Sequence, residues 1–413
     1  MEINELLQGV DCSCGRHHTC PIEQVVIAHD ALSSLPGLCE NYRRILLVCD
    51  ENTYRAAGEK AAAVLAGRIA CEKIFPGDTV LIPDEHAVGA IEACTEGKDL
   101  ILGAGSGVIQ DLCKYVSMDT GISYIIAATA PSMDGYASNG AAMILSGMKV
   151  TVKAGLPLAI VADTTVLRDA PADMIRSGYG DIIGKYSALN DWKLSALVNG
   201  EYFCPFIYDL TYEMIEKTRA LSGKLLSGDE ESMAVLMEAL VTVGIMMSFA
   251  GNSRPASGSE HHLSHFFEIT GIEKKMPYFS HGIDVGYSTV ITELMREELL
   301  SLSDWPARPV FERTAWEENI RRVYGGVAEG VIGLQDRLSW HENGFPEPSW
   351  DAVKKILSEV PSSKELESIL SGAGLFMEDF YAMYGKDKIA DAIRYGKDLK
   401  DRYTVLWLYE YKK

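Results

Sequence analysis

The segment GSEHHLSHFFE, residues 258–268, places three histidines within five positions of a chain that has 9 histidines in total. Read as a helix, the segment turns successive side chains about 100° apart, so His261 and His262 cannot both face one small ligand. His265 lies four residues after the first and three after the second. Helical geometry therefore allows the pair 261/265 or the pair 262/265, and the spacing alone leaves both open.

Two further residues can complete a metal site with these histidines. His281 follows after a short connector, and Asp181, in SGYGDIIGKYS, is expected just inside a helix whose glycines would let another element come close. Ser257 or Ser259 is expected to cap the histidine helix. Two imidazoles and a carboxylate, with one position open, suit zinc, nickel or ferrous iron acting as a Lewis acid. The alternative is that the histidines cap helices and bond to carboxylates.

A glycine-rich turn, GAGSGVIQD (103–111), lies between a predicted strand and a predicted helix. Its missing side chains let backbone N–H groups and the helix N-terminus approach a pyrophosphate. The spacing departs from the standard dinucleotide fingerprint, because the third glycine comes one position early and the motif does not follow the first strand. A tight turn without a ligand is the alternative. Asp50 ends an earlier strand and can accept hydrogen bonds from a ribose, so the two features together favour nucleotide binding.

Two kinds of domain are needed to position these residues. In the first part, buried strands are predicted at 43–53, 99–107, 123–132 and 158–167, and helices at 54–68 and 108–117, which is the alternation typical of a parallel α/β sheet. Beyond residue 170 the apolar residues recur at intervals of three and four residues, as they do in amphipathic helices. We predict a Rossmann-like nucleotide-binding domain over 1–168 and an all-helical metal- and substrate-binding domain over 169–413.

Composition restricts the class of protein. A chain of 413 residues exceeds what one hydrophobic core usually organises. The net charge of -20 argues against a nucleic-acid partner, because phosphate backbones are held by Lys and Arg. The start, MEINELLQGVDC, shows no secretory signal. The longest apolar stretch, 233–251, is uninterrupted only over 239–250, short of the roughly 20 residues that span a bilayer. We therefore expect a buried helix and no membrane insertion.

The 9 cysteines are mostly scattered singly, which favours reduced thiols in a cytoplasmic protein. One group, CSCGRHHTC (12–20), contains three cysteines and two histidines and has enough donors for zinc. Its Cys-x-Cys spacing is tighter than usual, however, and the second half of a structural zinc module is missing. The favoured interpretation is an N-terminal arm packed on the domain.

Six motifs in this order, GAGSGVIQDLCK, ATAPSMDGYAS, SGYGDIIGK, SRPASGSEHHLSH, HGIDVGYS and KDRYTVLW, resemble the sn-glycerol-1-phosphate dehydrogenases, most closely their bacterial NAD(P)-dependent branch. That family belongs with the iron-containing alcohol dehydrogenases, glycerol dehydrogenases and dehydroquinate synthases. The resemblance runs from about residue 20 to 405. It implies a dehydroquinate synthase-like fold, with an active site in the cleft between an α/β domain and a helical domain.

The resemblance also implies roles for individual residues. The metal ligands fall on Asp181, His262 and His281, which leaves His261 for a structural hydrogen bond. The substrate contacts fall on Asp134, Asp181 and His265, of which Asp134 and His265 are the catalytic residues. The implied nucleotide-binding positions are Asp50, Gly105, Gly107, Val108, Ile109, Gln110, Asp111, Thr129, Ala130, Pro131, Ser132 and Ser138.

The reaction that the resemblance implies is the reversible reduction of dihydroxyacetone phosphate to sn-glycerol 1-phosphate, a step of phospholipid metabolism, with NADH or NADPH. One divalent ion, nickel, zinc or ferrous iron, would polarise the ketone, and His265 or a water would relay the proton. A homodimer is implied as well. Asp50 would repel the 2'-phosphate of NADP, but the family uses NAD and NADP, so the preference stays open.

The phosphate of the substrate needs cationic or N–H donors. Sequence proximity to the ligands points to Arg254, to the N–H groups near Gly258 and Ser259, and to Lys185. Rival functions are a glycerol dehydrogenase, a dehydroquinate-synthase-like lyase, and a catalytically silent metal- and nucleotide-binding protein. The presence of the metal trio and of Asp134 argues against the silent protein.

Overall fold

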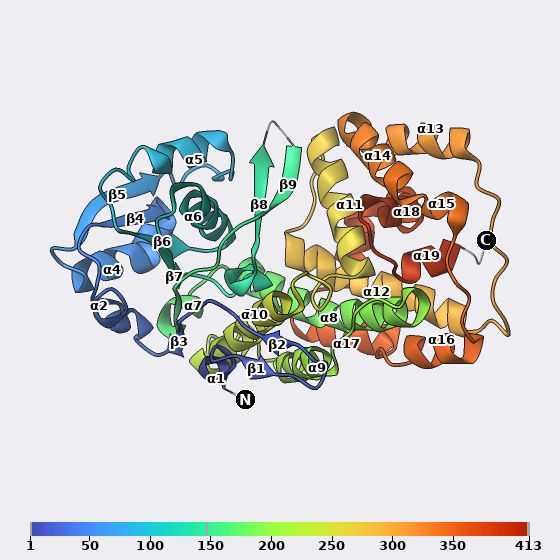
Figure 1. Cartoon of the computed structure of the whole chain (residues 1–413), viewed down its shortest axis with the longest axis horizontal. Coiled ribbons are helices and arrows are strands. Elements are labelled where there is room, and N and C mark those ends of the chain that lie inside the picture. Colours follow the sequence, from blue (N-terminus) through green and yellow to red (C-terminus); the bar gives the residue numbers. More distant parts are fainter. Residues whose placement is uncertain (1, 146–147, 411–413) are drawn as a thin grey trace. The chain divides into compact units, whose positions relative to one another are not determined.

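The computed structural model describes residues 2–145 and 148–410 of the chain (Figure 1). The chain forms two compact units: the first contains Met1–Gly178 and Lys224–Asn252, and the second contains Tyr179–Gly223 and Ser253–Lys413. The sequence-based boundary at 168/169 lies slightly before the end of the first segment. Nothing in the residue pattern signals that the chain returns to the first unit at Lys224, because the returning segment is a helix like its neighbours.

A six-stranded parallel sheet is the core of the first unit, in the order β3-β10-β7-β6-β4-β5. The strands are β3 (Gln24–Ala28), β4 (Ile45–Asp50), β5 (Ile69–Phe75), β6 (Leu100–Gly105), β7 (Tyr124–Ala128) and β10 (Ala159–Asp163). The four inner strands are the four that the sequence predicts. β3 and β5 were missed because edge strands are only partly buried and lack a continuous apolar run.

Short helices and two hairpins complete the first unit. Its apolar core joins inner-strand residues such as Leu47, Leu102 and Val161 to Leu35 and Ala61 of the helices. The remaining elements are α1 (Ile3–Leu6), β1 (Val10–Asp11), β2 (His17–His18), η1 (Ala31–Ser34), α2 (Leu35–Leu38), α3 (Glu51–Thr53), η2 (Tyr54–Gly58), α4 (Glu59–Val64), α5 (Glu85–Glu92), α6 (Gly107–Thr120), η3 (Asp134–Ala137), β8 (Gly140–Leu145), β9 (Met148–Lys153) and α7 (Thr164–Leu167).

The apolar stretch predicted to be a buried helix is α10 (Glu230–Ala250). Its length and its mean hydropathy of 2.0 would suffice to cross a membrane, but 78% of its apolar window is buried within the protein. It packs closely on η3 of the first unit, where a Cβ at Gly244 would lie 2.8 Å from the Asp134 carbonyl oxygen. α10 is therefore a core helix of the first unit.

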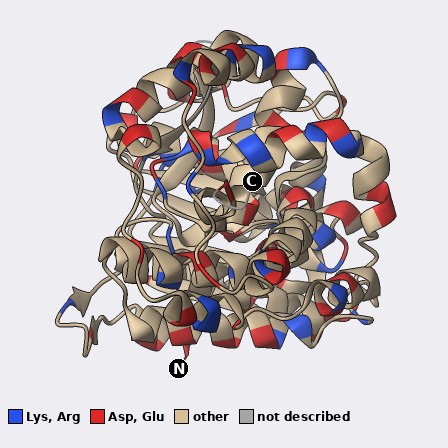
Figure 2. Cartoon of the chain, turned by 90° about the vertical axis from the view of Figure 1, so that its right-hand side faces the viewer, with Lys and Arg blue, Asp and Glu red and all other residues tan. Residues whose placement is uncertain are grey.

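The second unit is helical, as predicted: between residues 179 and 410, all of them described, every regular element is a helix. Acidic and basic residues are interspersed along the helices that face the viewer in Figure 2. The elements are the later part of α8 (Ala172–Asn199), α9 (Pro205–Arg219), α11 (Ser259–Lys274), α12 (His281–Leu300), α13 (Arg313–Tyr324), η4 (Gly325–Val327), α14 (Ala328–Leu338), α15 (Trp340–Asn343), α16 (Trp350–Leu357), α17 (Ser363–Gly372), α18 (Met377–Tyr395), η5 (Gly396–Leu399) and α19 (Val405–Glu410).

A buried carboxyl group joins α12 to α18. The hydroxyl of Tyr384 lies 2.7 and 2.8 Å from the two carboxyl oxygens of Asp284, and burial raises the pKa of Asp284 well above its usual value. Replacing Tyr384 by phenylalanine should lower the free energy of unfolding by about 1–3 kcal/mol, because a buried polar group loses its partner. Thermal unfolding measures this. Tyr381→Phe, at a side chain that is 45% exposed, is the control and should change little; equal melting temperatures for Tyr384→Phe and the unmodified protein would contradict the prediction.

Candidate metal and nucleotide sites

Three helices of the second unit bring together one carboxylate and two imidazoles. Asp181 lies on α8, His261 on α11 and His281 at the start of α12, and one donor atom from each lies within 4.8 Å of the others. The distance from His261 Nε2 to Asp181 Oδ1 is 3.6 Å, and the rings of His261 and His281 are 5.0 Å apart. One carboxylate and two imidazoles form a donor set of the kind that holds catalytic divalent metals.

Glycines beside Asp181 allow this convergence. A Cβ at Gly180 would lie 2.3 Å from the carbonyl oxygen of Gly282, and one at Gly184 would lie 2.3 Å from Val285 Cγ1. Both neighbours belong to α12, so any larger residue would push His281 away from Asp181. The expectation that glycines near Asp181 admit another element is confirmed.

Neighbouring side chains fix the orientation of the donors. Oε1 of Glu260 is 2.7 Å from His261 Nδ1 and also accepts from the N–H of Gly258 at 2.8 Å. When one ring nitrogen donates to a carboxylate, the other nitrogen is held in the orientation that a metal ligand needs. Lys185 donates to Asp181 Oδ1 at 2.5 Å. Glu260 was missed in the sequence, where the only signal is an acidic residue next to the histidines.

Protonation also suits a metal ligand. Burial, and then the charges of Lys185 and His281, lowers the pKa of His261 well below its usual value, so the ring is neutral near pH 7. Burial, with the charge of Asp191, raises the pKa of Glu260 to about 7. A neutral ring whose Nδ1–H points to Glu260 presents the Nε2 lone pair on the side of Asp181.

The histidine of α11 that lies in this group of donors is His261, whereas the sequence resemblance implied His262 as the ligand. His262 is fully buried, and neither ring nitrogen has a hydrogen-bond partner among the described residues. Its side chain points in a different direction from that of His261, because neighbouring side chains on a helix diverge by about 100°. His265, one turn after His261, has its ring 6.1 Å from that of His261 and 5.5 Å from that of His281. Of the two pairs that helical spacing allowed, 261/265 is the one beside His281.

The start of α11 differs from the expectation as well. Gly258, and neither Ser257 nor Ser259, is the N-cap residue. The N–H of Gly258 donates to Glu260, and the N–H of Ser259 donates to Asp191 Oδ2 at 2.6 Å. Carboxylates of the protein therefore occupy the N–H groups that the sequence suggested for a phosphate.

The other phosphate candidates also have protein partners. The guanidinium of Arg254 is buried and donates to Glu201, to Ser195 and to the carbonyl oxygen of Tyr403. Lys185 donates to Asp181, as described above. Arg254 is 3% exposed and Lys185 is 0% exposed, so neither side chain offers a cationic group at the surface of this unit.

Two basic residues that the sequence analysis did not single out gather at the start of α11. Lys400 Nζ donates to Ser257 Oγ at 3.2 Å, and Arg402 donates to the carbonyl oxygen of Ser257 at 3.0 Å. After burial, the charges of Lys400 and Arg402 are the largest causes that lower the pKa of His262. Burial lowers the pKa of Arg402 itself to about 10. Both residues lie in the KDRYT motif, which was noted without a role.

In the first unit, the glycine turn and Asp50 lie at neighbouring strand ends. β4 ends at Asp50 and β6 ends at Gly105, and these two strands pair directly. From β4 the chain continues outward to β5, whereas from β6 it continues the other way to β7 and β10. The carboxyl ends on either side of such a reversal are where open α/β sheets bind nucleotides. α6 begins there, at Gly107.

Packing explains two of the three glycines. A Cβ at Gly103 would lie 2.9 Å from Cys113 Sγ, and one at Gly105 would lie 2.5 Å from Ile109 Cβ, so both allow α6 to pack on β6. At Gly107 the nearest atom would be Met133 Cε at 3.7 Å, an ordinary contact. Protein packing thus does not require Gly107, which fits a position that faces a ligand.

Several predicted nucleotide-binding side chains also bond within the protein. Asp50 caps α3, with Oδ1 accepting from the N–H groups of Asn52 and Thr53 at 2.8 Å each. Gln110 is buried and donates to Tyr124 and Tyr136, so only its backbone is suited to a nucleotide. The other predicted positions are Val108 and Asp111 in the first turns of α6, Thr129, Ala130, Pro131 and Ser132 after β7, Asp134 in η3 and Ser138 after it, all in the first unit.

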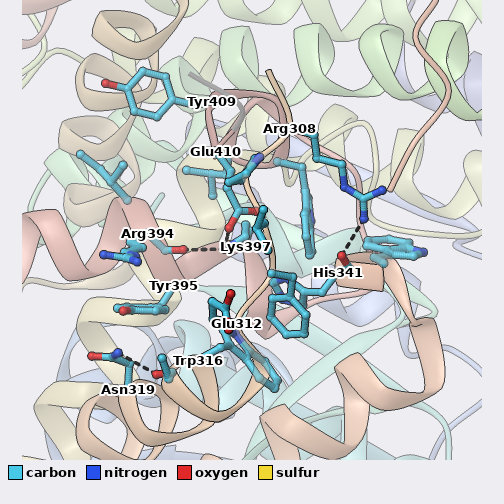
Figure 3. Close-up of a pocket in the computed structure, with 18 residues that line it drawn as sticks. Arg308, Glu312, Trp316, Asn319, His341, Arg394, Tyr395, Lys397, Tyr409 and Glu410 are labelled. Carbon is cyan, nitrogen blue, oxygen red and sulfur yellow. Dashed lines mark hydrogen bonds and ion pairs between the residues drawn. The ribbon is translucent and has the colours of Figure 1, made fainter. Parts of the chain in front are cut away.

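A cavity of about 310 Å³ in the second unit is a different feature (Figure 3). It is lined by residues between Arg308 and Glu410, including the aromatic rings of Trp316, His341 and Trp407. His341 bonds to Asp398 at 2.7 Å, and Lys397 donates to the carbonyl oxygen of Arg394. Since the metal donors lie on α8, α11 and α12, this cavity is not the metal site.

The fold and the donor set define the class of protein. The model of the family described as iron-containing alcohol dehydrogenase matches residues 26–171. Among solved structures, maleylacetate reductase from Rhizobium sp. strain MTP-10005 has a TM-score of 0.61 at 12% identity over 96% of each chain. The iron-containing alcohol dehydrogenase from Thermococcus thioreducens has a TM-score of 0.59 at 16% identity, over 90% of this chain and 89% of that one. These likenesses confirm the dehydroquinate synthase-like fold.

Curated relatives narrow the class to one family. The glycerol-1-phosphate dehydrogenase (NAD(P)+) of Halalkalibacterium halodurans is 34% identical over 96% of this chain and 94% of its own length. That of Bacillus licheniformis is 31% identical over 96% and 90%. The chain therefore belongs to the glycerol-1-phosphate dehydrogenase family, as the motifs predicted.

Proposed function

We propose that this protein reversibly reduces dihydroxyacetone phosphate to sn-glycerol 1-phosphate with NADH or NADPH. The cluster of Asp181, His261 and His281 is the main support for the proposal, because these donors can hold a metal ion that acts as a Lewis acid. The relatives that match over most of the chain are named glycerol-1-phosphate dehydrogenases. The second unit holds the metal, and the first unit holds the dinucleotide.

A divalent ion at that cluster, nickel, zinc or ferrous iron, supplies Lewis acidity toward the ketone oxygen, and the nicotinamide supplies the hydride. The chain keeps the donors in place. Glu260 holds the His261 ring by its Nδ1–H, and Lys185 neutralises part of the charge of Asp181. His265 lies next to both ligand histidines and passes a proton to or from the substrate oxygen through a ring nitrogen.

The phosphate group of the substrate binds at Lys400 and Arg402. Both cations converge on Ser257 before α11, one residue from the N-cap and in the same unit as the metal donors. Arginine and lysine form charge-assisted hydrogen bonds to phosphate, which are the stronger kind. Asp134 and His265 contact the polar groups of the three-carbon unit, together with Asp181 through the metal.

The dinucleotide binds at the ends of β4 and β6. The pyrophosphate lies at the turn from Gly105 to Asp111, which includes Gly107, Val108, Ile109 and Gln110. Further contacts with the dinucleotide come from Thr129 to Ser132 and from Ser138. Asp50 receives the adenosine ribose. The chain acts in the cytoplasm and forms a homodimer. Size-exclusion chromatography with light scattering measures the molar mass and so tests the homodimer.

The direct test compares two substrates. NADH oxidation should be fast with dihydroxyacetone phosphate and at least about 100-fold less efficient with dihydroxyacetone, because the phosphate contacts are missing. A chelator should abolish turnover, and re-addition of single ions with elemental analysis should identify the metal. Equal rates with dihydroxyacetone would instead indicate a glycerol dehydrogenase, and release of phosphate without net NADH oxidation would indicate a lyase.

Asp50 should influence the choice of dinucleotide. Asp50→Asn removes the charge but keeps the oxygen that caps α3. A repulsion of about 1 kcal/mol between two exposed charges predicts that the ratio of kcat/KM for NADPH to that for NADH rises about fivefold. Steady-state kinetics with both dinucleotides measures the ratio. An unchanged ratio together with an unchanged melting temperature would show that Asp50 serves only as a helix cap.

A further inference from the structure

The N-terminal hairpin of the first unit collects sulfur and nitrogen donors that have no part in the proposed catalytic mechanism. β1 and β2 pair antiparallel, with Asp11 opposite His17, and the turn between them is closed by the N–H of Cys12 donating to the carbonyl oxygen of Arg16 at 3.1 Å. Gly15 completes the turn with a φ of 83°, which favours glycine. This turn sets Cys12 and Cys14 on the same side as His18.

The distances between the donors suit one small ion. The Sγ atoms of Cys12 and Cys14 and the Nε2 atom of His18 all lie within 4.8 Å of one another. Cys14 Sγ and His18 Nε2 are 3.4 Å apart. Bonds of about 2.3 Å to sulfur and about 2.0 Å to nitrogen put such a pair about 3.5 Å apart around tetrahedral zinc. The N–H of Cys14 points to Cys12 Sγ at 3.5 Å, a contact that stabilises a thiolate.

The histidine is oriented as metal ligands are. His18 is buried, and its Nδ1 lies 3.1 Å from the carbonyl oxygen of Phe249, on α10 of the same unit. A carbonyl only accepts, so Nδ1 carries the hydrogen and the Nε2 lone pair faces the sulfur atoms. The ring also stacks on Phe249, 5.2 Å away at an interplanar angle of 10°. The adjacent His17 is exposed and pairs with Asp11 instead.

We propose that Cys12, Cys14 and His18 bind a zinc ion, separate from the catalytic metal. Two thiolates and an imidazole select zinc, whereas the cluster around Asp181 has no sulfur. Water or a further side chain takes the fourth position. The ion links the N-terminal hairpin to α10, since His18 is anchored at Phe249. This revises the interpretation of CSCGRHHTC as a packed arm without metal.

Cobalt titration of the metal-free, reduced full chain tests the proposal. Sulfur ligands give cobalt an intense near-ultraviolet charge-transfer band, which oxygen and nitrogen ligands do not. The unmodified protein should develop this band, and a Cys12→Ser/Cys14→Ser variant should not. Cys71→Ser/Cys94→Ser, which removes two partly buried cysteines elsewhere in the first unit, is the matched control and should keep the band.

Two further variants separate this site from the catalytic one. Asp181→Asn should keep the band, because Asp181 is not a ligand of this zinc. The test of the zinc site therefore stays valid even if the proposed catalytic function is wrong. His18→Asn should weaken cobalt binding at least about 10-fold, and His17→Asn should not. Replacing a residue that only orients a metal ligand already lowers metal affinity about 10–100-fold, so the loss of a ligand should lower it at least as much. A band that is absent from the unmodified protein, or that persists in the Cys12/Cys14 variant, would overturn the proposal. Elemental analysis should find one zinc fewer per chain in that variant.

Discussion

Replacing His261 by alanine should remove the catalytic metal and lower kcat/KM for dihydroxyacetone phosphate at least about 1,000-fold. The reason is that the ring supplies one of three protein ligands, and Lewis-acid stabilisation is worth several kcal/mol, with each 1.36 kcal/mol equal to a factor of ten. Metal content by elemental analysis and steady-state kinetics, on the same preparation, measure both effects.

His262 provides the matched control for that variant. It is the next residue, is also buried and lies on the same helix, yet it lies outside the group of metal donors. His262→Gln should therefore retain the metal. The assignment of His261 would fail if the His262 variant lost the metal while the His261 variant kept it, and the assignment drawn from the sequence resemblance would then be restored.

Replacing Lys400 and Arg402 together by alanine should lower kcat/KM for dihydroxyacetone phosphate about 100-fold or more. Hydrogen bonds to charged groups contribute about 1.5–3 kcal/mol each, and two of them would be lost. The same variant should use dihydroxyacetone about as well as the unmodified protein does, since that substrate has no phosphate.

This substrate comparison also guards against a purely structural effect. Both residues bond to Ser257, so their loss could disturb α11 and the metal donors on it. In that case the rates with both substrates, and the metal content, would fall in parallel. A parallel fall would remove Lys400 and Arg402 from the phosphate site, whereas a loss confined to the phosphorylated substrate supports it.

Much of the fold could be predicted from local patterns. The inner strands β4, β6, β7 and β10 are continuous apolar runs because both faces of a parallel sheet are buried, so the sequence reveals them directly. The helices of the second unit were predictable because their apolar residues recur at intervals of three and four residues. The edge strands β3 and β5 are half exposed, and the same rule gives no signal for them.

The site was predictable in its parts and less so in its arrangement. Asp181, His265 and His281 were identified from residue type and spacing, and the structure places them with the metal cluster or beside it. The choice between His261 and His262 depends on the rotation of α11 about its own axis. That rotation is fixed by Asp191, which accepts from the N–H of Ser259, and by packing on α12, and both lie elsewhere in the sequence.

The sequence by itself thus determined the family, the two kinds of domain and the candidate metal donors, because these depend on residue type, motifs and periodicity within short segments. Only the tertiary structure decided which histidine faces Asp181, that Arg254 is held by Glu201, and that Lys400 and Arg402 reach the start of α11. Those facts depend on contacts between segments up to about 150 residues apart, where a rotation of one helix by a single position exchanges one side chain for the next.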